Sequence, residues 1–143
     1  MNTSVSNNLS FLGSVGAASV LTSQTTSSTS YTDLATSGPA VTVTTLTSAI
    51  VTISLVAANN TINDGAIATY AVSGATTVAA ADGNGYTGVV GNLPANGEVA
   101  TTTSIVVTGL TAGSNTFTVK YRANVGGTAT FLNRFINVEP LTT

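Results

Sequence analysis

The chain has no cysteine, no histidine and no tryptophan, and it carries only three basic and five acidic residues among 143. Without cysteine no disulfide can form, and without histidine as well the usual zinc and copper ligands are missing. The first 119 residues contain no lysine or arginine, whereas phosphate binding needs clustered bases. We therefore expect no metal, no other cofactor and no nucleic-acid partner.

Long apolar runs are also missing. No run approaches the roughly 18 apolar residues that a membrane-spanning helix needs, so we expect no membrane insertion. Residues 1–20 contain no base, which makes export through an ordinary secretory signal unexpected. A charged surface normally keeps small soluble domains apart. The scarcity of charged residues in this chain indicates that much of its surface faces other subunits.

The residues that are present favour a folded β protein. The chain is 43% apolar and 6% charged, whereas disordered chains combine low hydrophobicity with high charge. Several segments alternate apolar with polar residues or are rich in β-branched ones, and Gly, Asn and Pro turns separate them. These segments are 40–45, 49–57, 66–74, 86–90, 101–108, 115–124 and 128–138. We predict an all-β fold, an antiparallel β-sandwich of the jelly-roll type with seven or eight strands.

The first 38 residues differ from the rest in composition. They are rich in Ser and Thr, and neither helical nor strand periodicity lasts for long. Their apolar side chains include Leu9, Phe11, Leu12 and Val15, interrupted by glycines that weaken a helix. We predict an extended N-terminal arm over 1–38 for attachment or subunit contact, with these four residues as candidate contacts, followed by a β-sandwich domain over 39–143.

No catalytic site is evident in the sequence. The segment "GNGYTG" at 83–88 matches a dinucleotide-binding pattern, but Gly91 and Pro94 follow at once and exclude the helix that the pattern requires. The segment "DGNG" at 82–85 is typical of the start of a calcium loop, but it lacks the late glutamate. The five acids are far apart in sequence, and serine and threonine lack a histidine base. We expect no enzyme and no catalytic residues.

All three bases lie near the end of the chain, in a segment predicted to be a β-hairpin, 110–141. On its first strand Phe117, Val119 and Tyr121 share one face, and alternation places Lys120 and Arg122 on the other. On its second strand Arg134 shares a face with Leu132, Ile136 and Val138, opposite Phe131, Asn133, Phe135 and Asn137. We expect Lys120, Arg122 and Arg134 to be outer-face or inter-subunit contacts. Arg134 is expected to meet an acid such as Glu139 or Asp64, or carboxylates or backbone carbonyls at a subunit contact.

Two stretches resemble a known family. The closing "VVTGLTAGSNTFTVKYRANVGGTATFLNRFINVEPL" and the opening "SYTDLATSGPAVTVTT" at 30–45 are similar to the strands of phage virion proteins with small jelly-roll domains. Those domains are related in shape to the C1q and tumour-necrosis-factor group. The resemblance covers strand and turn residues and does not extend to the first 29 residues. It implies a homotrimeric β-sandwich on a phage particle.

Three functions are compatible with these observations. The first is a capsid decoration, or cement, protein that binds itself and the major capsid protein in a virion assembled in the host cytoplasm. The second is a tail-fibre or head-fibre tip that binds a host surface glycan through exposed aromatics, with Tyr31, Tyr70, Tyr86 and Tyr121 as candidates. The third is a bacterial adhesin or surface-layer module, which the missing export signal disfavours. We expect the first.

Overall fold

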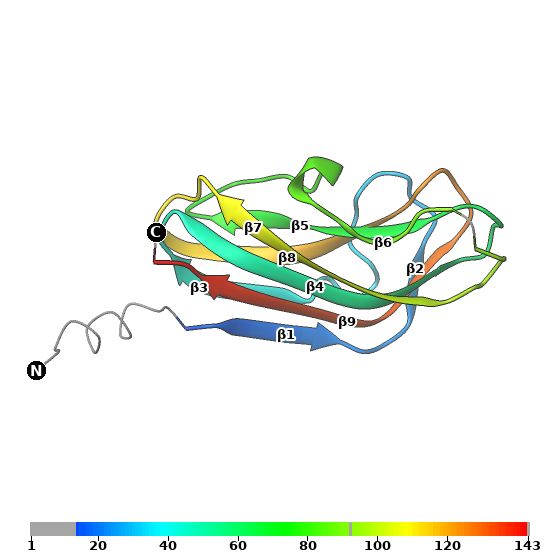
Figure 1. The fold of residues 1–143 in the computed structure, drawn as a ribbon, viewed down its shortest axis with the longest axis horizontal. Helices are drawn as coiled ribbons and strands as arrows, with labels where there is room; N and C mark the ends of the chain where they lie inside the picture. The colour runs from blue at the N-terminus through cyan, green and yellow to red at the C-terminus, as the bar shows by residue number, and fades with distance from the viewer. Residues whose placement is uncertain (1–13, 92, 143) are drawn as a thin grey trace, which may run out of the picture.

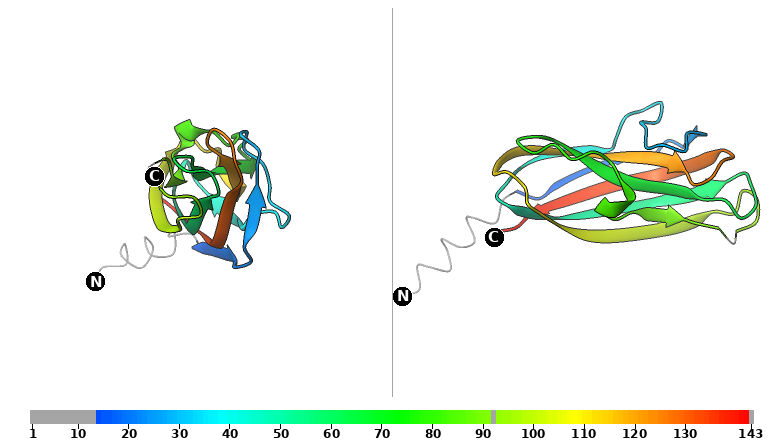
Figure 2. Two further views of the ribbon diagram at one scale, coloured as in Figure 1. Left: turned by 90° about the vertical axis from the view of Figure 1, so that its right-hand side faces the viewer. Right: turned by 90° about the horizontal axis from the view of Figure 1, so that it is seen from above.

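The computed structural model describes residues 14–91 and 93–142, which form two antiparallel sheets packed face to face (Figures 1 and 2). Sheet A contains β1 (Gly16–Val20), β2 (Gln24–Thr26), β4 (Ser48–Asn59), β7 (Val99–Thr108) and β9 (Ala129–Pro140). Sheet B contains β3 (Ala40–Thr45), β5 (Ala66–Gly74), β6 (Thr87–Val89) and β8 (Gly113–Ala123), and a short 3-10 turn, Asp82–Asn84, precedes β6. Among the described residues there is no α-helix.

The strand order is β1-β9-β4-β7 in sheet A, with β2 also paired to β9, and β3-β8-β5-β6 in sheet B. The predicted all-β antiparallel sandwich is confirmed. The seven segments predicted as strands correspond to β3 through β9. Two further strands, β1 and β2, lie within residues 1–38 and were not predicted.

The predicted closing hairpin is wrong. Strands β8 and β9 do not pair with each other: β8 lies between β3 and β5, and β9 lies between β1 and β4. Each strand has one apolar face, and these faces meet across the core, where the rings of Tyr121 and Phe131 are 4.8 Å apart. The turn between the two strands therefore crosses from sheet B to sheet A.

Alternation along the strands builds the core. On β8 the side chains of Phe117, Val119 and Tyr121 are fully buried, as predicted, while Lys120 and Arg122 lie on the outer face. The ring of Tyr70 on β5 packs 6.0 Å from that of Phe117. The largest buried apolar side chains of sheet A are Val51, Ile53, Leu55, Phe131, Ile136 and Val138.

A β-bulge in β9 changes the predicted faces of that strand. Asn133 has a positive φ of 49°, and the register between β4 and β9 shifts between Ser54 and Val56. As a result Phe131 is buried on the same side as Arg134, and Leu132 is turned away from the core. The assignment of Phe131 and Leu132 was wrong because a bulge adds one residue and reverses the alternation on one side of it.

The described part of residues 1–38 is paired with both sheets. Strand β1 pairs with β9 from Gly16 opposite Val138 to Val20 opposite Arg134. Beyond β2 the chain crosses to sheet B and follows β8, where Thr32 and Tyr121 exchange two backbone hydrogen bonds of 2.9 and 3.0 Å. Strand β1 and the C-terminal end of β9 lie at the same end of the sandwich (Figure 1).

Candidate functional site

The outward face of sheet A is a four-stranded surface with almost no charge. Residues from the four strands form cross-strand rows, and Glu139 on β9 is the one ionisable side chain on this face within β1, β4, β7 and β9. Two of its apolar side chains are well exposed, Val106 at 63% and Phe135 at 45%. The two middle rows are Ala17, Asn137, Thr52 and Ser104, and Ser19, Phe135, Ser54 and Thr102.

Hydroxyl groups on this face bond to each other. The hydroxyls of Thr52 and Ser104 are 2.7 Å apart, and Thr102 donates a hydrogen bond of 2.9 Å to Ser54. Burying a hydroxyl is costly when it loses its hydrogen bonds to water and gains none in return. The cost is much smaller when the hydroxyl is already bonded to another group of the protein. The face can therefore be covered by another surface without leaving these hydroxyls unpaired.

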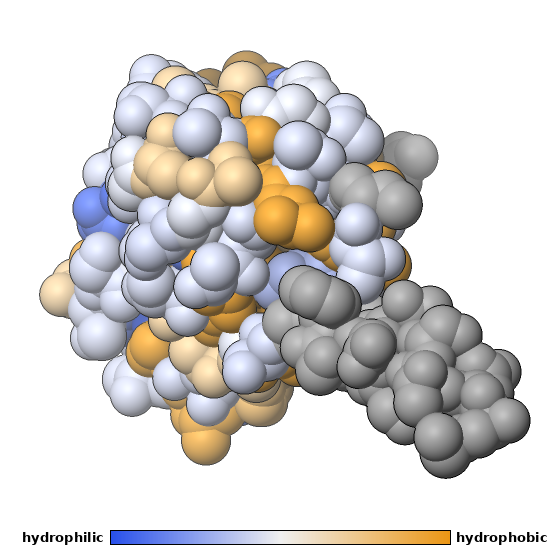
Figure 3. Space-filling view, turned by 90° about the vertical axis from the view of Figure 1, so that its left-hand side faces the viewer, coloured by the Kyte–Doolittle hydropathy of each residue, from blue (hydrophilic) through white to orange (hydrophobic). Residues whose placement is uncertain are grey.

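The same face is hollowed along β1. A shallow groove of about 330 Å³ lies over β1, β9 and β4. We call it the Phe135 groove; it is lined by Ala17, Ser19, Thr52, Ser54, Phe135 and Asn137. The surface at the end of the sandwich where β1 begins shows apolar residues among weakly polar ones, with few strongly hydrophilic atoms (Figure 3).

The outer face of sheet B carries the ion pairs. Lys120 lies 2.7 Å from Asp33, and Arg122 lies 2.9 Å from Asp82. Asp33 belongs to the segment that pairs with β8 at Thr32, and Asp82 belongs to the 3-10 turn before β6, so the bases of β8 hold both segments in place. Because acids of the same chain neutralise Lys120 and Arg122, these two bases form no free cationic patch.

Tyr31 completes the second of these pairs. Its hydroxyl donates a hydrogen bond of 2.6 Å to Asp82, and the guanidinium carbon of Arg122 is 5.3 Å from its ring centroid. The hydrogen bond from Tyr31 and then that from Arg122 lower the pKa of Asp82. Burial, with Asp82, raises the pKa of Tyr31. At neutral pH Asp82 and Arg122 are therefore both ionised, and Tyr31 is a neutral hydrogen-bond donor.

Arg134 does not meet an acid. Its side chain is fully buried, and its terminal nitrogens donate to the carbonyl oxygens of Gly38 (3.3 Å) and Thr22 (3.4 Å) and to Oε1 of Gln24 (2.8 Å). Neither Glu139 nor Asp64, the two predicted partners, contacts it among the described residues. All three acceptors belong to the same chain, so the predicted subunit contact is replaced by an internal one that ties residues 22–38 to sheet A.

Asp64 does not contact Arg134 and instead joins two turns of the chain. Its carboxylate accepts backbone N–H bonds from Gly65 (2.6 Å), Val125 (2.9 Å) and Gly126 (2.6 Å). Burial raises its pKa, but the three N–H donors outweigh burial and hold the pKa below its ordinary value. Asp64 thereby links the turn after β4 to the turn after β8.

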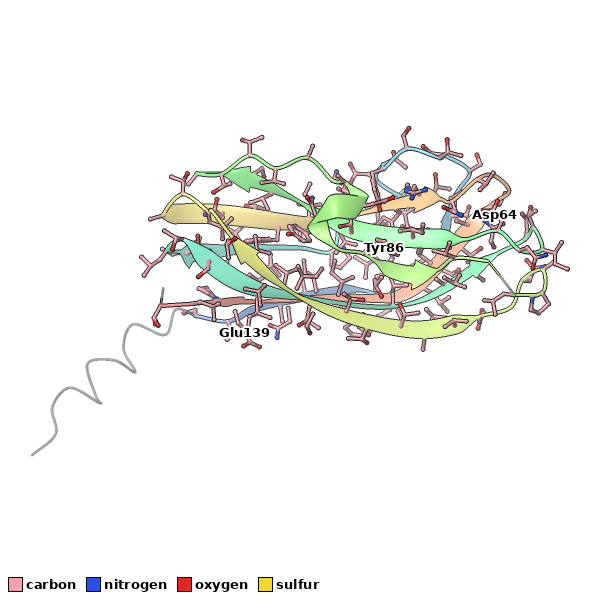
Figure 4. All side chains as sticks on the ribbon, turned by 45° about the horizontal axis from the view of Figure 1, so that its top comes forward. Asp64, Tyr86 and Glu139 are labelled. Carbon is pink, nitrogen blue, oxygen red and sulfur yellow. The ribbon has the colours of Figure 1, made fainter. Side chains whose placement is uncertain are left out.

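Within residues 14–91 and 93–142 the acidic side chains do not come together as a catalytic group would require. Asp64 and Glu139 lie toward opposite ends of the sandwich (Figure 4). Asp33 and Asp82 are each bound to a base. Among the described residues no group of three or more acids could hold a metal ion. In the same part of the chain, no helix is long and apolar enough to cross a membrane.

The predicted contact residues have different outcomes. Leu9, Phe11 and Leu12 lie outside the described residues. Val15 is 60% exposed just before β1. Lys120 and Arg122 lie on the outer face, as expected, and Arg134 is buried. The uncharged face of sheet A was not predicted. A signal for it exists in the sequence, because Thr52 and Ser54 on one strand, and Thr102 and Ser104 on another, occupy every second position and so share a face.

Among the tyrosines proposed for glycan contact, two are excluded from direct stacking by burial. Tyr70 and Tyr121 have 4% and 0% exposure, and burial raises the pKa of Tyr121 to about 12. Tyr31 is partly covered by Arg122. Tyr86 is 44% exposed, immediately before β6.

Comparison with known proteins supports the fold. No protein-family model matches the chain, and no curated protein matches it. Among solved structures, the Eiger tumour-necrosis factor of S. frugiperda is similar to it, with a TM-score of 0.57 and 11% identity, covering 92% of this chain and 94% of that one. At this identity the likeness concerns the fold alone. The chain has a jelly-roll β-sandwich fold similar to that of this tumour-necrosis factor.

Proposed function

We propose that the chain is a structural virion protein, a capsid decoration protein that forms homotrimers through the outward face of sheet A. The observation that carries the proposal is the nature of this face: four strands wide, with Glu139 as its one charge, and with its central hydroxyls bonded to each other. Such a surface loses little on desolvation. Interface cores are likewise depleted in charged residues.

The distribution of charge supports this orientation. Lys120, Arg122, Asp33 and Asp82 all lie on the outside of sheet B. In the proposed trimer these ion pairs face outward, where water solvates them, and the uncharged face points toward the neighbours. The number three and the phage particle come from the family resemblance. The proposal includes binding to the major capsid protein and no catalytic role.

The oligomer is tested by analytical ultracentrifugation of the purified chain. We expect a trimer mass for the wild type and a monomer for Val106→Glu, which places a charge on the proposed interface. Thr42→Glu is the matched control, because Thr42 is an exposed β-branched residue on the outer face of sheet B. A wild-type monomer, or equal effects of the two substitutions, would overturn assembly through this face.

The virion location is tested by electron microscopy of purified particles. Many copies at capsid symmetry positions are the expected result, together with lower heat stability of particles stripped of the protein. A few copies at the tail would reject decoration.

A fibre tip that binds host glycans is the second candidate, and exposed Tyr86 favours it. Aromatic rings present a flat apolar face for stacking against sugars. Binding of the isolated protein to a glycan array that is lost in Tyr86→Ala would support this function. No binding across glycans of the host surface would exclude it.

A further inference from the structure

The dipeptide Asn-Gly occurs twice in the chain, at 84–85 and at 96–97. In an Asn-Gly pair the backbone nitrogen of glycine can attack the side-chain amide carbon of asparagine, because glycine has no side chain to hinder the approach and adopts many backbone conformations. The reaction needs an asparagine side chain that is free to turn toward that nitrogen. The two sites can therefore be compared by what holds each asparagine side chain in place.

The side chain of Asn84 is held in place. Its Nδ2 donates hydrogen bonds to the backbone oxygens of Ala79 (2.8 Å) and Tyr70 (3.2 Å). The glycine that follows is closely packed, since a Cβ added to Gly85 would lie 2.9 Å from Cγ1 of Ile105. Asn84 is partly buried, in the 3-10 turn before β6. Both side-chain hydrogen bonds must break before its amide carbon can meet the nitrogen of Gly85.

The side chain of Asn96 is exposed, and it forms no hydrogen bond with any other described residue. The backbone here turns between β6 and β7, and the N–H of Gly97 donates to the carbonyl oxygen of Pro94 at 3.0 Å. The glycine of the other pair forms an equivalent bond to Asp82, also at 3.0 Å, so the two attacking nitrogens are alike in this respect. The difference between the two sites is therefore the anchoring of the asparagine side chain.

We propose that Asn96 is a site of spontaneous modification, at which the side chain loses ammonia to the backbone. The nitrogen of Gly97 gives up its proton and bonds to Cγ of Asn96. The bond from Cγ to Nδ2 breaks, and Nδ2 takes up a proton and leaves as ammonia, so a cyclic succinimide remains. Water then opens the ring. Cleavage of the bond from the ring nitrogen to Cγ gives aspartate, and cleavage of its bond to the main-chain carbonyl carbon gives isoaspartate.

Either product changes the turn between β6 and β7. Both add a negative charge to a chain of net charge -2. Isoaspartate also lengthens the backbone by a carbon atom, at a residue whose φ is 61° and whose N–H donates to the carbonyl oxygen of Asn59 at 2.7 Å. We expect the isoaspartate form to lose this bond, which joins the turn to the end of β4. The modification goes beyond the proposed assembly and does not depend on it, because residues 94–97 lie outside the strands of the uncharged face.

Peptide mapping of the purified full-length chain tests the proposal. The folded protein is incubated at mildly alkaline pH, where more of the attacking amide is deprotonated, and mass spectrometry of its digest follows the replacement of NH2 by OH at each site. We expect modification at Asn96 to be about tenfold faster than at Asn84, since each hydrogen bond that must break at Asn84 stabilises its side chain. In guanidinium chloride, where both turns are unfolded, the two rates should become similar.

Isoelectric focusing of variants gives a second measurement. Asn96→Gly keeps a residue that tolerates a positive φ but removes the side-chain amide, so it should lose the acidic species that forms fastest. Asn84→Ser is the matched control, because it removes the other Asn-Gly pair. It should form that acidic species at the wild-type rate.

Equal rates at the two sites in the folded protein would overturn the proposal, as would faster modification at Asn84. The proposal would also be overturned if Asn96 stayed unmodified in the folded protein but reacted in guanidinium chloride, since the turn would then protect it. These outcomes do not depend on the mass of the oligomer or on the location of the protein in a virion, so the modification and the proposed function fail separately.

Discussion

Arg134 and Tyr121 donate to the same acceptor: the carbonyl oxygen of Gly38 receives bonds of 3.3 Å from Arg134 Nη1 and 2.8 Å from the Tyr121 hydroxyl. The guanidinium carbon also lies 5.3 Å from the centroid of the Tyr121 ring. Residues from both sheets thus hold one carbonyl of the segment that leads into β3. Arg134 Nε is buried without a partner among the described residues.

The first prediction concerns this buried charge. Arg134→Ala should lower the free energy of unfolding by about 3 kcal/mol, because it leaves a cavity and removes hydrogen bonds to Thr22, Gly38 and Gln24. Arg134→Met should cost within about 1 kcal/mol, since it fills the same space and no longer buries an unpaired charge. Urea unfolding measures both. Equal losses in the two variants would show that the hydrogen bonds outweigh the cost of burying the charge.

The second prediction concerns pH and Asp64. Because backbone donors hold its pKa below the value in the unfolded chain, the carboxylate contributes stability above the unfolded pKa of about 3.9 and loses it as the pH falls through the folded pKa. Asp64→Asn should cost about 2 kcal/mol at pH 7, and the difference from wild type should shrink at low pH. Unfolding curves at several pH values test this, with exposed Glu98→Gln as control. A difference that stays constant with pH would contradict it.

The third prediction concerns the bulge in β9. Asn133 has a φ of 49°, a region that asparagine tolerates and β-branched residues avoid. Asn133→Val should destabilise the fold by roughly 1–3 kcal/mol, whereas Asn133→Gly should change stability by about 0.5 kcal/mol or less. Thermal unfolding measures both. If Asn133→Val left the thermal stability unchanged, β9 would be able to adopt a regular register without the bulge.

The fourth prediction concerns the contact between β1 and β3. A Cβ atom on Gly16 would overlap the side chain of Val41 and lie 2.8 Å from Cγ1 of Val43. Gly16→Ala should therefore destabilise the protein by about 1–3 kcal/mol, as overpacked positions do. Hydrogen exchange should show the loss concentrated in β1. Ala17→Ser, one residue on but facing outward, is the control and should be near neutral.

Alternation predicted most strands well but not their partners. The apolar face of β8 was predicted correctly because Phe117, Val119 and Tyr121 occupy every second position without interruption. The pattern along a strand does not state which sheet it joins, so β8 and β9 were wrongly paired. Periodicity also does not reveal a bulge, which is why Phe131 was assigned to the wrong face.

Two features of the candidate site could not be predicted for a related reason. Strand β1 is five residues long and begins with a glycine, Gly16, so it gave little periodic signal. The uncharged face combines residues of β1, β4, β7 and β9, and it appears only when their register is known. The aliphatic neighbours of Arg134 were noted, but it was predicted to be an outer-face or inter-subunit contact; its actual partners come from residues 22–38 and depend on the tertiary fold.

The central place of β9 in sheet A affects how the protein is made. Strand β9 is the last of the described strands, and β1, β2 and β4 all pair with it. While a ribosome still holds the residues up to Pro140, these three strands lack that partner, and β1 and β2 pair with no other strand among the described residues. Sheet A therefore closes only after β9 has emerged from the ribosome, although β1, β2 and β4 are synthesised earlier.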